Sequence, residues 1–210
     1  MDSDAAGGFF IAFEGGEGSG KSTQTKLLTA WLESQGRSVL TTRQPGGTEV
    51  GATLRNILLD PATGDLAPRT EALIYLADKA EHAHKVLRPA LASGQVVVTD
   101  RYIESMLAYQ GAGRDLAPQE LGPIAQWATH GLNPDLTIVL DIDPVVGLER
   151  AGEPDRIEAE PLEFHQRVRQ FFLDAAAGSA AHTVISAAQS PESVHAHIIE
   201  VVAERLAIRR

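Results

Sequence analysis

The stretch Gly15-Gly16-Glu17-Gly18-Ser19-Gly20-Lys21-Ser22-Thr23 decides the fold of this chain, because it directly follows the apolar run from Phe9 to Phe13. It fits the phosphate-loop pattern of a glycine, four residues and Gly-Lys-Ser, in the strand–loop–helix context that this pattern requires. Glycines let several backbone N–H groups point into one hollow, and the helix beginning near Lys21 adds its positive dipole end. The alternative is a glycine-rich turn with a chance Lys-Ser pair. With the context satisfied, the stretch predicts a site for a nucleoside triphosphate.

Two side chains of this loop have expected roles of their own. Lys21 can bridge the β- and γ-phosphate oxygens, and the Ser22 hydroxyl can hold Mg²⁺. The loop residues expected to bind the nucleotide are Gly15, Gly16, Glu17, Gly18, Ser19, Gly20, Lys21, Ser22 and Thr23. The loop alone leaves three outcomes open: transfer to water, transfer to a small acceptor, or a non-catalytic switch. No Asn-Lys-x-Asp run for guanine recognition occurs, which argues against a GTPase.

Short β-rich runs alternate with longer helical patterns along the rest of the chain. Strands are expected at 9–13, 38–42, 96–98, 136–140 and 183–186, and in the long helical stretch from about residue 69, Pro89 forces a kink or a restart. Such alternation predicts a parallel sheet covered on both faces, a three-layer α/β fold. We expect one domain over 9–210, a disordered N-terminus over 1–8, and an exposed, mobile segment at about 150–160.

Composition excludes several kinds of protein. The 210 residues carry 18 Lys+Arg and 28 Asp+Glu, a net charge of −10, so the positive field needed to coat nucleic acid or an anionic membrane is missing. The chain contains no cysteine, which excludes disulfides and thiol nucleophiles. No apolar run approaches the ~20 residues of a membrane span, and no signal peptide is recognisable. We therefore expect a cytoplasmic protein with no nucleic-acid or membrane partner.

A second polar cluster, Asp100-Arg101-Tyr102, directly follows the strand expected at 96–98. Ligands of open parallel sheets lie at the carboxyl ends of the strands, so Asp100 and Arg101 should face the same crevice as Lys21. Asp100 is suited to a Mg²⁺-bound water, and the planar fork of Arg101 to a second phosphate. The alternative is an ordinary surface Asp–Arg ion pair, which contributes little.

Several motifs in register resemble bacterial thymidylate kinases, and the resemblance extends from about residue 9 to 206. The motifs are Phe13–Thr23, Thr42–Thr48, Asp100–Tyr102, Ala108–Gly111, Pro134–Thr137 and Asp155–Glu158. The resemblance implies the reaction ATP + dTMP → ADP + dTDP, which belongs to thymidine nucleotide biosynthesis. It also implies Mg²⁺, a P-loop kinase fold with a five-stranded parallel sheet and a short lid, and a homodimer.

The resemblance also assigns roles to individual residues. Arg101 is similar to the main ligand of the dTMP phosphate, and Glu17 to a loop acid near the sugar and the transferring phosphate. Arg43 and Pro45 resemble a loop shaped by a cis proline, and Arg55 an arginine near the acceptor. Residues that resemble the base and sugar site are Tyr75, Lys79, Ser105, Tyr109 and Gln110. For Tyr75 the alternative is a core tyrosine.

The phosphate loop contains no arginine between Gly15 and Gly20, so the chain resembles the class that takes its catalytic arginine from the lid. The candidates are Arg150 and Arg156. A positioned arginine can contribute ~10³–10⁵ to the rate of phosphoryl transfer. The alternative is that these arginines only pair with nearby acids, namely Glu149, Asp155 or Glu158.

Four features depart from the family pattern. Gln44 stands where glutamate is usual, Lys79 where an arginine usually contacts the base, and Met106 where a small hydroxyl residue is usual; the lid is also short. Lysine loses the bidentate geometry of arginine, and methionine donates no hydrogen bond. The departures leave two alternatives open: a kinase for another pyrimidine monophosphate or a nucleoside, and a nucleotide-binding regulator without turnover.

Overall fold

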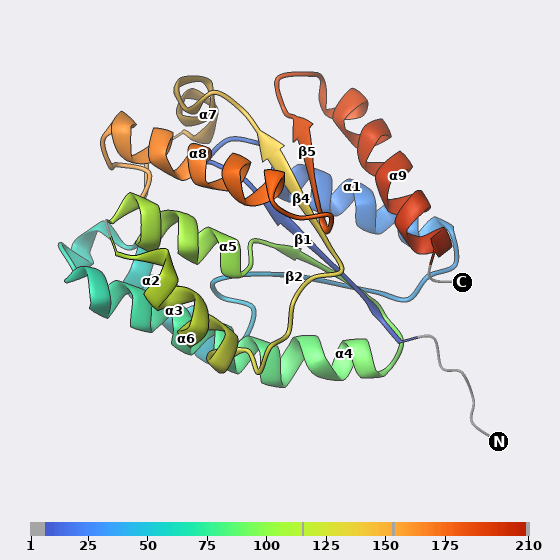
Figure 1. Cartoon of the computed structure of the whole chain (residues 1–210), viewed down its shortest axis with the longest axis horizontal. Coiled ribbons are helices and arrows are strands. Elements are labelled where there is room, and N and C mark those ends of the chain that lie inside the picture. Colours follow the sequence, from blue (N-terminus) through green and yellow to red (C-terminus); the bar gives the residue numbers. More distant parts are fainter. Residues whose placement is uncertain (1–6, 115, 153, 209–210) are drawn as a thin grey trace.

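The apolar run before the phosphate loop forms the central strand of the sheet. The computed structural model describes residues 7–114, 116–152 and 154–208. Five parallel strands, β1 to β5, lie in the order β2-β3-β1-β4-β5 (Figure 1). Their bounds are Phe9–Glu14, Val39–Arg43, Val96–Asp100, Leu136–Asp141 and His182–Ser186. The predicted five-stranded parallel sheet is confirmed.

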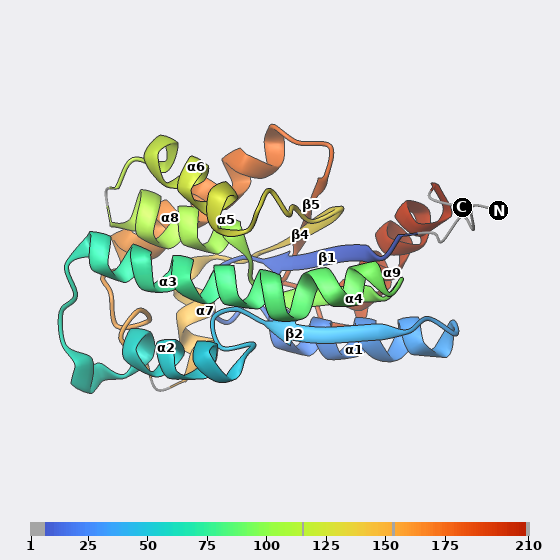
Figure 2. The same ribbon diagram turned by 90° about the horizontal axis from the view of Figure 1, so that it is seen from below.

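Helices cover both faces of this sheet, as Figures 1 and 2 show. One layer contains α1 (Lys21–Ser34) and α9 (Pro191–Ile208). The opposite layer contains α3 (Pro68–His82), α4 (Arg88–Ala92), α5 (Ile103–Met106), α6 (Pro118–Ala128) and α8 (Leu162–Ala177). The remaining helices are α2 (Glu49–Leu59), which packs against α3, and α7 (Pro144–Ala151). The three-layer α/β prediction is thus confirmed.

Strand β1 is buried on both faces because each face meets a helical layer. Ile11 and Phe13 pack with residues of α1 and α9, whereas Phe10 and Ala12 pack with residues of α3 and α6. Every residue of β1 is buried, as expected for a central parallel strand. None of the helices in the described ranges has the length and apolar character needed to span a membrane.

Two helical stretches contain π-helical turns. The long stretch from residue 69 restarts near Pro89, as predicted: a π-helical turn, Ala83–Leu87, precedes α4, and Pro89 lies in the first turn of α4. Proline is tolerated there because the first N–H groups of a helix have no partner within it. After Asp100, α5 gives way to a second π-helical turn, Leu107–Gly113. Sequence periodicity does not distinguish such wide turns from a regular helix.

The sequence predicts a disordered N-terminus over 1–8 and a mobile segment at about 150–160, but described residues of both segments contact the rest of the fold. Gly8 donates its backbone N–H to Leu91 O (3.0 Å), so residue 8 is held by the rest of the fold; residues 1–6 lie outside the described ranges. In the expected lid, Ile157 is buried against the core side chains Phe164 and Val168. The sequence did not predict this contact, because Ile157 is a single apolar residue within a polar run.

The packing of α9 gives a stability prediction. Ile198 is fully buried in the core shared with α1. We expect Ile198→Ala to lower the free energy of unfolding by about 2–5 kcal/mol, because it leaves a cavity. The exposed residue Glu200 on the same helix provides the control, and Glu200→Ala should change the value by less than about 0.5 kcal/mol. Equal effects of the two substitutions in urea denaturation would contradict the packing of α9 described above.

Candidate active site

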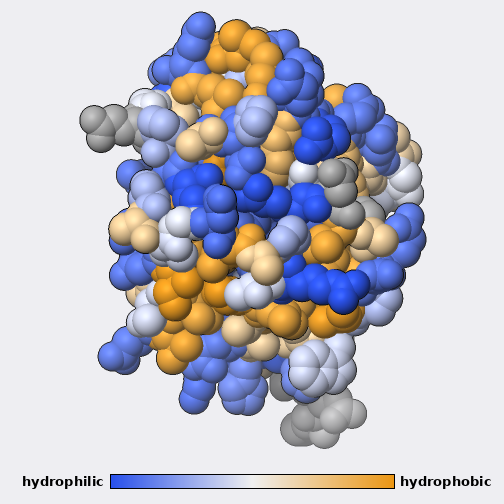
Figure 3. All heavy atoms as spheres, turned by 90° about the vertical axis from the view of Figure 1, so that its left-hand side faces the viewer, coloured by the Kyte–Doolittle hydropathy of each residue, from blue (hydrophilic) through white to orange (hydrophobic). Residues whose placement is uncertain are grey.

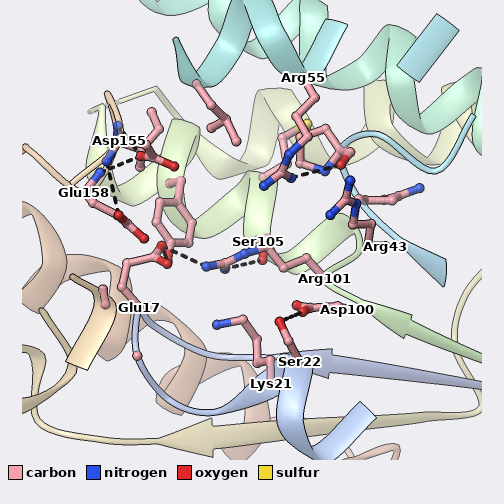
Figure 4. A pocket seen from close by; sticks show the side chains of 18 of the residues that line it. Glu17, Lys21, Ser22, Arg43, Arg55, Asp100, Arg101, Ser105, Asp155 and Glu158 are labelled. Atoms are coloured by element: carbon pink, nitrogen blue, oxygen red, sulfur yellow. Dashed lines mark hydrogen bonds and ion pairs between the residues drawn. The ribbon is translucent and has the colours of Figure 1, made fainter. Parts of the chain in front are cut away.

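A cleft of about 500 Å³ opens at the carboxyl ends of the strands. Figure 3 faces this edge of the sheet and shows a hydrophilic band between two more hydrophobic areas. The side chains in the cleft come from the phosphate loop, β2, α2, α3, β3, the π-helical turn after α5 and the expected lid (Figure 4). The predicted site residues that line it are Glu17, Gly18, Gly20, Lys21, Ser22, Thr23, Arg43, Pro45, Arg55, Tyr75, Lys79, Asp100, Arg101, Ser105, Tyr109, Gln110 and Arg150. Four predicted residues are not in its lining: Gly15, Gly16, Ser19 and Arg156.

The phosphate loop is held together by its own lysine. Lys21 Nζ donates to the carbonyl oxygens of Gly15 (3.1 Å) and Gly16 (2.7 Å) and to Ser19 Oγ (3.2 Å). Burial, reinforced by Arg101, lowers the pKa of Lys21 to about 8. Gly15 has a positive φ of 131°, and a Cβ there would lie 2.4 Å from the carbonyl oxygen of Leu140. Gly15 and Gly16 thus shape the loop, even though they do not line the cleft.

Ser22 and Asp100 form an oxygen-rich pair at the floor of the cleft. Ser22 Oγ donates to Asp100 Oδ2 at 2.7 Å (Figure 4). Sheet register brings them together, since Asp100 of β3 lies opposite Phe13, close before the loop in β1. A hydroxyl and a carboxylate fit the oxygen preference of Mg²⁺, which commonly completes its shell with substrate phosphates and water. Within the described ranges no group of three His, Cys, Asp or Glu residues could hold a metal without such a contribution.

Arg101 occupies the centre of the cleft in a strained backbone conformation. Its φ of 70° lies in the left-handed region, which residues other than glycine rarely adopt. The guanidinium donates to Glu17 Oε1 (2.8 Å), to Gly15 O (3.1 Å) and to Ser105 Oγ (3.1 Å). It also lies over the ring of Tyr109, 4.9 Å from the centroid. The structure therefore excludes the alternative of an ordinary Asp–Arg surface pair.

Two carboxylates, the half-buried Glu17 and the buried Glu14, hold Arg101 and its surroundings. Burial opposes the charge of Glu17, but Arg101 and Lys21 outweigh it and lower the pKa of Glu17 to about 2. Glu17 Oε1 also accepts a hydrogen bond from the Tyr109 hydroxyl (2.6 Å). Glu14 accepts from the backbone N–H groups of Tyr102 (2.8 Å) and Ser105 (3.2 Å), and burial raises its pKa. Sequence reasoning missed this role of Glu14, because a strand residue before the loop carries no signal for it.

The opposite wall of the cleft carries Arg43 and Arg55. Both are among the residues that line the cleft in Figure 4. Arg55 Nη1 donates to the carbonyl oxygen of Pro45 (3.0 Å), and the Gln44–Pro45 peptide bond is cis. The sequence left the isomer of this bond open, and its cis form agrees with the loop that Arg43 and Pro45 resemble. Three guanidinium groups, those of Arg43, Arg55 and Arg101, therefore line one cleft together with Lys21.

The remaining wall of the cleft is formed by α3, the end of α5 and the π-helical turn after it. Tyr75 is half-buried and lines the cleft, so it is not confined to the core. Lys79, Met106 and Gln110 are buried and line the cleft beside it. Sequence reasoning gave Gln44 and Met106 only as departures from a pattern, and the structure makes both part of the lining.

The two candidate lid arginines have different environments. Arg150 lines the cleft, and its Nη1 donates to the carbonyl oxygen of Ala187 (3.1 Å). Arg156 turns away: Nε donates to Leu58 O (2.7 Å), and Nη2 forms an ion pair with Glu71. The expected alternative partners Glu149, Asp155 and Glu158 are therefore wrong for Arg156. Glu71 is 85 residues away in sequence, so no local pattern could reveal it.

Glu71 joins three elements around one carboxylate. It is fully buried and accepts from Gln110 Nε2 (2.9 Å) and from Arg114 Nε (3.2 Å) as well as from Arg156. Burial disfavours its charge, but the hydrogen bonds from these three partners outweigh burial and lower its pKa. The ion pairs fix the segment that carries Arg156 to α3, the helix of Tyr75 and Lys79.

This network gives a second stability prediction. Glu71→Ala leaves two guanidinium groups without their buried carboxylate, so we expect the free energy of unfolding to fall by about 3–5 kcal/mol. The exposed Glu33 in α1 serves as the matched control, and Glu33→Ala should have little effect. A Glu71→Ala variant that denatures at the urea concentration of the parent chain would rule out the network as a source of stability.

The fold and the cleft define a class of protein: a P-loop kinase in which the phosphate-loop lysine and three arginines line one cleft. The sequence profile described as Thymidylate kinase matches residues 13–198. A thymidylate kinase from Cutibacterium acnes is 50% identical over 189 residues, covering 90% of this chain and 93% of that protein. One from Leifsonia xyli is 50% identical over 195 residues, covering 91% and 92%. The crystal structure of thymidylate kinase from Ehrlichia chaffeensis aligns with a TM-score of 0.79 at 31% identity, covering 93% of this chain and 99% of that one. The chain belongs to the thymidylate kinase family.

Proposed function

We propose that this cleft catalyses the ATP-dependent phosphorylation of dTMP to dTDP, the reaction of its family, by direct in-line transfer. The observation that supports this proposal most is the presence of two anion-binding groups in one cleft. On one side lies the phosphate loop with Lys21, and on the other the guanidinium groups of Arg43, Arg55 and Arg101. A kinase for a phosphorylated acceptor needs both, since it must bring two phosphates together against their mutual repulsion.

The nucleotide side binds the triphosphate of ATP. Loop N–H groups and the first turn of α1 face the phosphates, and Lys21 would exchange its contacts with the loop for phosphate oxygens. Ser22 and Asp100 would hold Mg²⁺, directly or through water. When bound, the ion neutralises charge on the β- and γ-phosphates.

The acceptor side positions dTMP without removing a proton. A monophosphate oxygen is already ionised at neutral pH, so the reaction needs no general base. The low pKa of Glu17 fits this, because a carboxylate with a pKa of about 2 is a poor base and a stable partner for Arg101. Glu17 thus orients Arg101 and Tyr109, and Arg101 with Arg43 aligns the acceptor phosphate. The residues proposed to bind base and sugar are Tyr75, Lys79, Ser105, Tyr109 and Gln110.

Of the two arginines in the expected lid, Arg150 is the one we propose to stabilise the transferring phosphoryl group. It lines the cleft, and the Cβ of Arg150 lies close to Gly18 of the phosphate loop. Arg156 instead anchors the segment through Glu71. ATP and dTMP are polyanions that do not cross a bilayer unaided, so a cytoplasmic location accompanies this reaction.

A panel of acceptors tests the proposed function. We expect ADP release to depend on dTMP and on Mg²⁺, and not to occur with thymidine, which lacks the phosphate that Arg101 would bind. Arg101→Ala should lower kcat/KM for dTMP by about 10³-fold or more, because it removes a positioned guanidinium from the transition state. Arg69→Ala, at an exposed position at the start of α3, is the matched control.

The outcomes of this panel separate the candidate functions. Turnover of another pyrimidine monophosphate or of a nucleoside in preference to dTMP would favour the alternative kinases. ATP binding without ADP release for any acceptor would indicate a nucleotide-binding regulator. Unchanged kcat/KM in Arg101→Ala would contradict the role given to Arg101.

A homodimer belongs to the same proposal, supported by an exposed apolar face. Leu73 on α3 is 62% exposed, and Ile124 and Trp127 on the adjoining α6 are 42% and 78% exposed. Exposed apolar side chains gathered on packed helices are typical of protein–protein contacts. A second copy of the chain is the occupant that the family resemblance implies.

Sedimentation tests this part of the proposal. We expect the chain to sediment as a dimer and Trp127→Glu to shift it towards the monomer, because a buried unpaired charge opposes association. Val184→Glu, at a 44% exposed position on the edge strand β5, should leave the dimer intact. A parent chain that sediments as a monomer at micromolar concentration would refute the dimer, but it would not contradict the proposed reaction.

A further inference from the structure

Two of the departures from the family pattern meet in space. Lys79 Nζ donates to Gln44 Oε1 at 2.9 Å, although 35 residues separate them, and both side chains are buried and line the cleft. The same ammonium donates to the carbonyl oxygen of Tyr102 at 2.7 Å. Lysine has three N–H donors, and within the described ranges these contacts account for two. One donor therefore remains for the cleft that Lys79 lines.

The orientation of the Gln44 amide follows from its neighbours. Lys79 can only donate, so the amide oxygen must face Lys79, and the amide nitrogen faces His82 Nδ1 at 2.8 Å. His82 Nδ1 must then accept, which leaves the proton on Nε2, where it faces Thr42 Oγ1 at 2.7 Å. Burial, reinforced by Lys79, lowers the pKa of His82 to about 4, in agreement with a neutral ring. A chain of polar groups from Thr42 through His82 thus presents the Gln44 oxygen to Lys79.

Among the residues that the structure describes, no carboxylate is in contact with the ammonium of Lys79. Its two hydrogen-bond acceptors are neutral, and burial lowers its pKa to about 8 against the favourable influence of Asp78 and Glu14. An ammonium with neutral partners retains a strong attraction for a further acceptor in a low-dielectric site. The acceptor that distinguishes thymine from cytosine is the carbonyl oxygen at C4, where cytosine carries an amino group. A donor that selects thymine must therefore face that oxygen.

We propose that Gln44 is a positioning residue for Lys79, and that the two act as one coupled unit that aims a single ammonium N–H at the C4 carbonyl of the acceptor base. This inference rests on the proposed function, since it concerns how dTMP is selected in that cleft. Glutamate at position 44 with Lys79 retained would neutralise the ammonium and draw it from the base. Arginine at 79 with Gln44 retained would place a guanidinium beside an amide that accepts only at one oxygen. Changing both residues together gives an arginine and a glutamate that can form a bidentate ion pair. His82 can then donate from Nδ1 to the glutamate, while the Thr42 hydroxyl donates to His82 Nε2.

A double-mutant cycle tests the coupling. We would measure kcat and KM for dTMP and dCMP at saturating ATP for the parent chain, Gln44→Glu, Lys79→Arg and the double variant. Each single substitution should raise KM for dTMP about 10-fold and reduce the preference for dTMP over dCMP, with kcat changed less than about 3-fold. The double variant should return to within about 3-fold of the parent KM. Gln35→Glu and Lys85→Arg, both at exposed positions, are the controls.

The outcomes distinguish this inference from the function on which it rests. A double variant in which the two effects multiply, or single variants with unchanged KM, would overturn the coupled unit while leaving the kinase intact. A parent chain that does not turn over dTMP would overturn the proposed function itself. If the variants at the buried positions 44 and 79 show no cooperative melting, two dTMP analogues are tested with the parent chain instead. Sulfur in place of oxygen at C4 of the base is a weaker acceptor and should raise KM about 10-fold, whereas sulfur at C2 should leave KM unchanged. Equal effects of the two analogues on KM would contradict the inference.

Discussion

The parallel pairing of β1 with β3 is the constraint on which the site depends. It sets Phe13 opposite Asp100, so the loop that leaves β1 and the Asp100-Arg101 pair that leaves β3 emerge at the same edge of the sheet. Arg101 then donates to Gly15 O, and Asp100 accepts from Ser22, which joins the nucleotide side to the acceptor side. A slip of one residue would turn Arg101 to the other face and separate the two. The buried apolar side chains of β1 fix that register, so the packing of the core determines the geometry of the cleft.

A chain with net charge −10 must concentrate its cations to bind two polyanions, and carboxylates within the fold hold these cations in place. Glu17 holds Arg101 at the centre of the cleft, and Glu71 holds Arg156 and Arg114 behind it. Glu17 keeps Arg101 in one orientation, which lowers the entropy lost when a phosphate arrives. Arg156 and Arg114 do not line the cleft, and their pairing with Glu71 instead fixes the surrounding segments. The left-handed backbone conformation of Arg101 has the same effect as its pairing with Glu17. The surrounding hydrogen bonds stabilise this strained conformation, so the guanidinium is already positioned when the substrate binds.

Much of this arrangement was predictable from the sequence, and what was not has a common cause. The phosphate loop, the five strands and the position of Arg101 follow from local patterns, because a strand–loop–helix motif and a polar pair after a strand are readable over a few residues. Arg43 and Arg55 were predicted only from the family resemblance. Contacts between distant positions are not readable in this way: Glu71 with Arg156, Gln44 with Lys79 and Glu14 with Ser105 join residues 85, 35 and 91 positions apart. The wide helical turn at Leu107–Gly113 was missed because a regular helix has the same composition.

The difference between the two arginines of the expected lid shows how such contacts assign function. Arg156 would have to leave a buried carboxylate to reach a phosphate, and breaking a buried ion pair costs about 3–5 kcal/mol. Arg150 would give up only a hydrogen bond to the carbonyl oxygen of Ala187, a loss of about 1.5–3 kcal/mol that a phosphate oxygen can replace. The sequence alone names both arginines as candidates, six residues apart, without showing their partners. Those partners bind Arg156 to a buried carboxylate and Arg150 only to a carbonyl oxygen, and this difference supports the proposal that Arg150 acts on the phosphates.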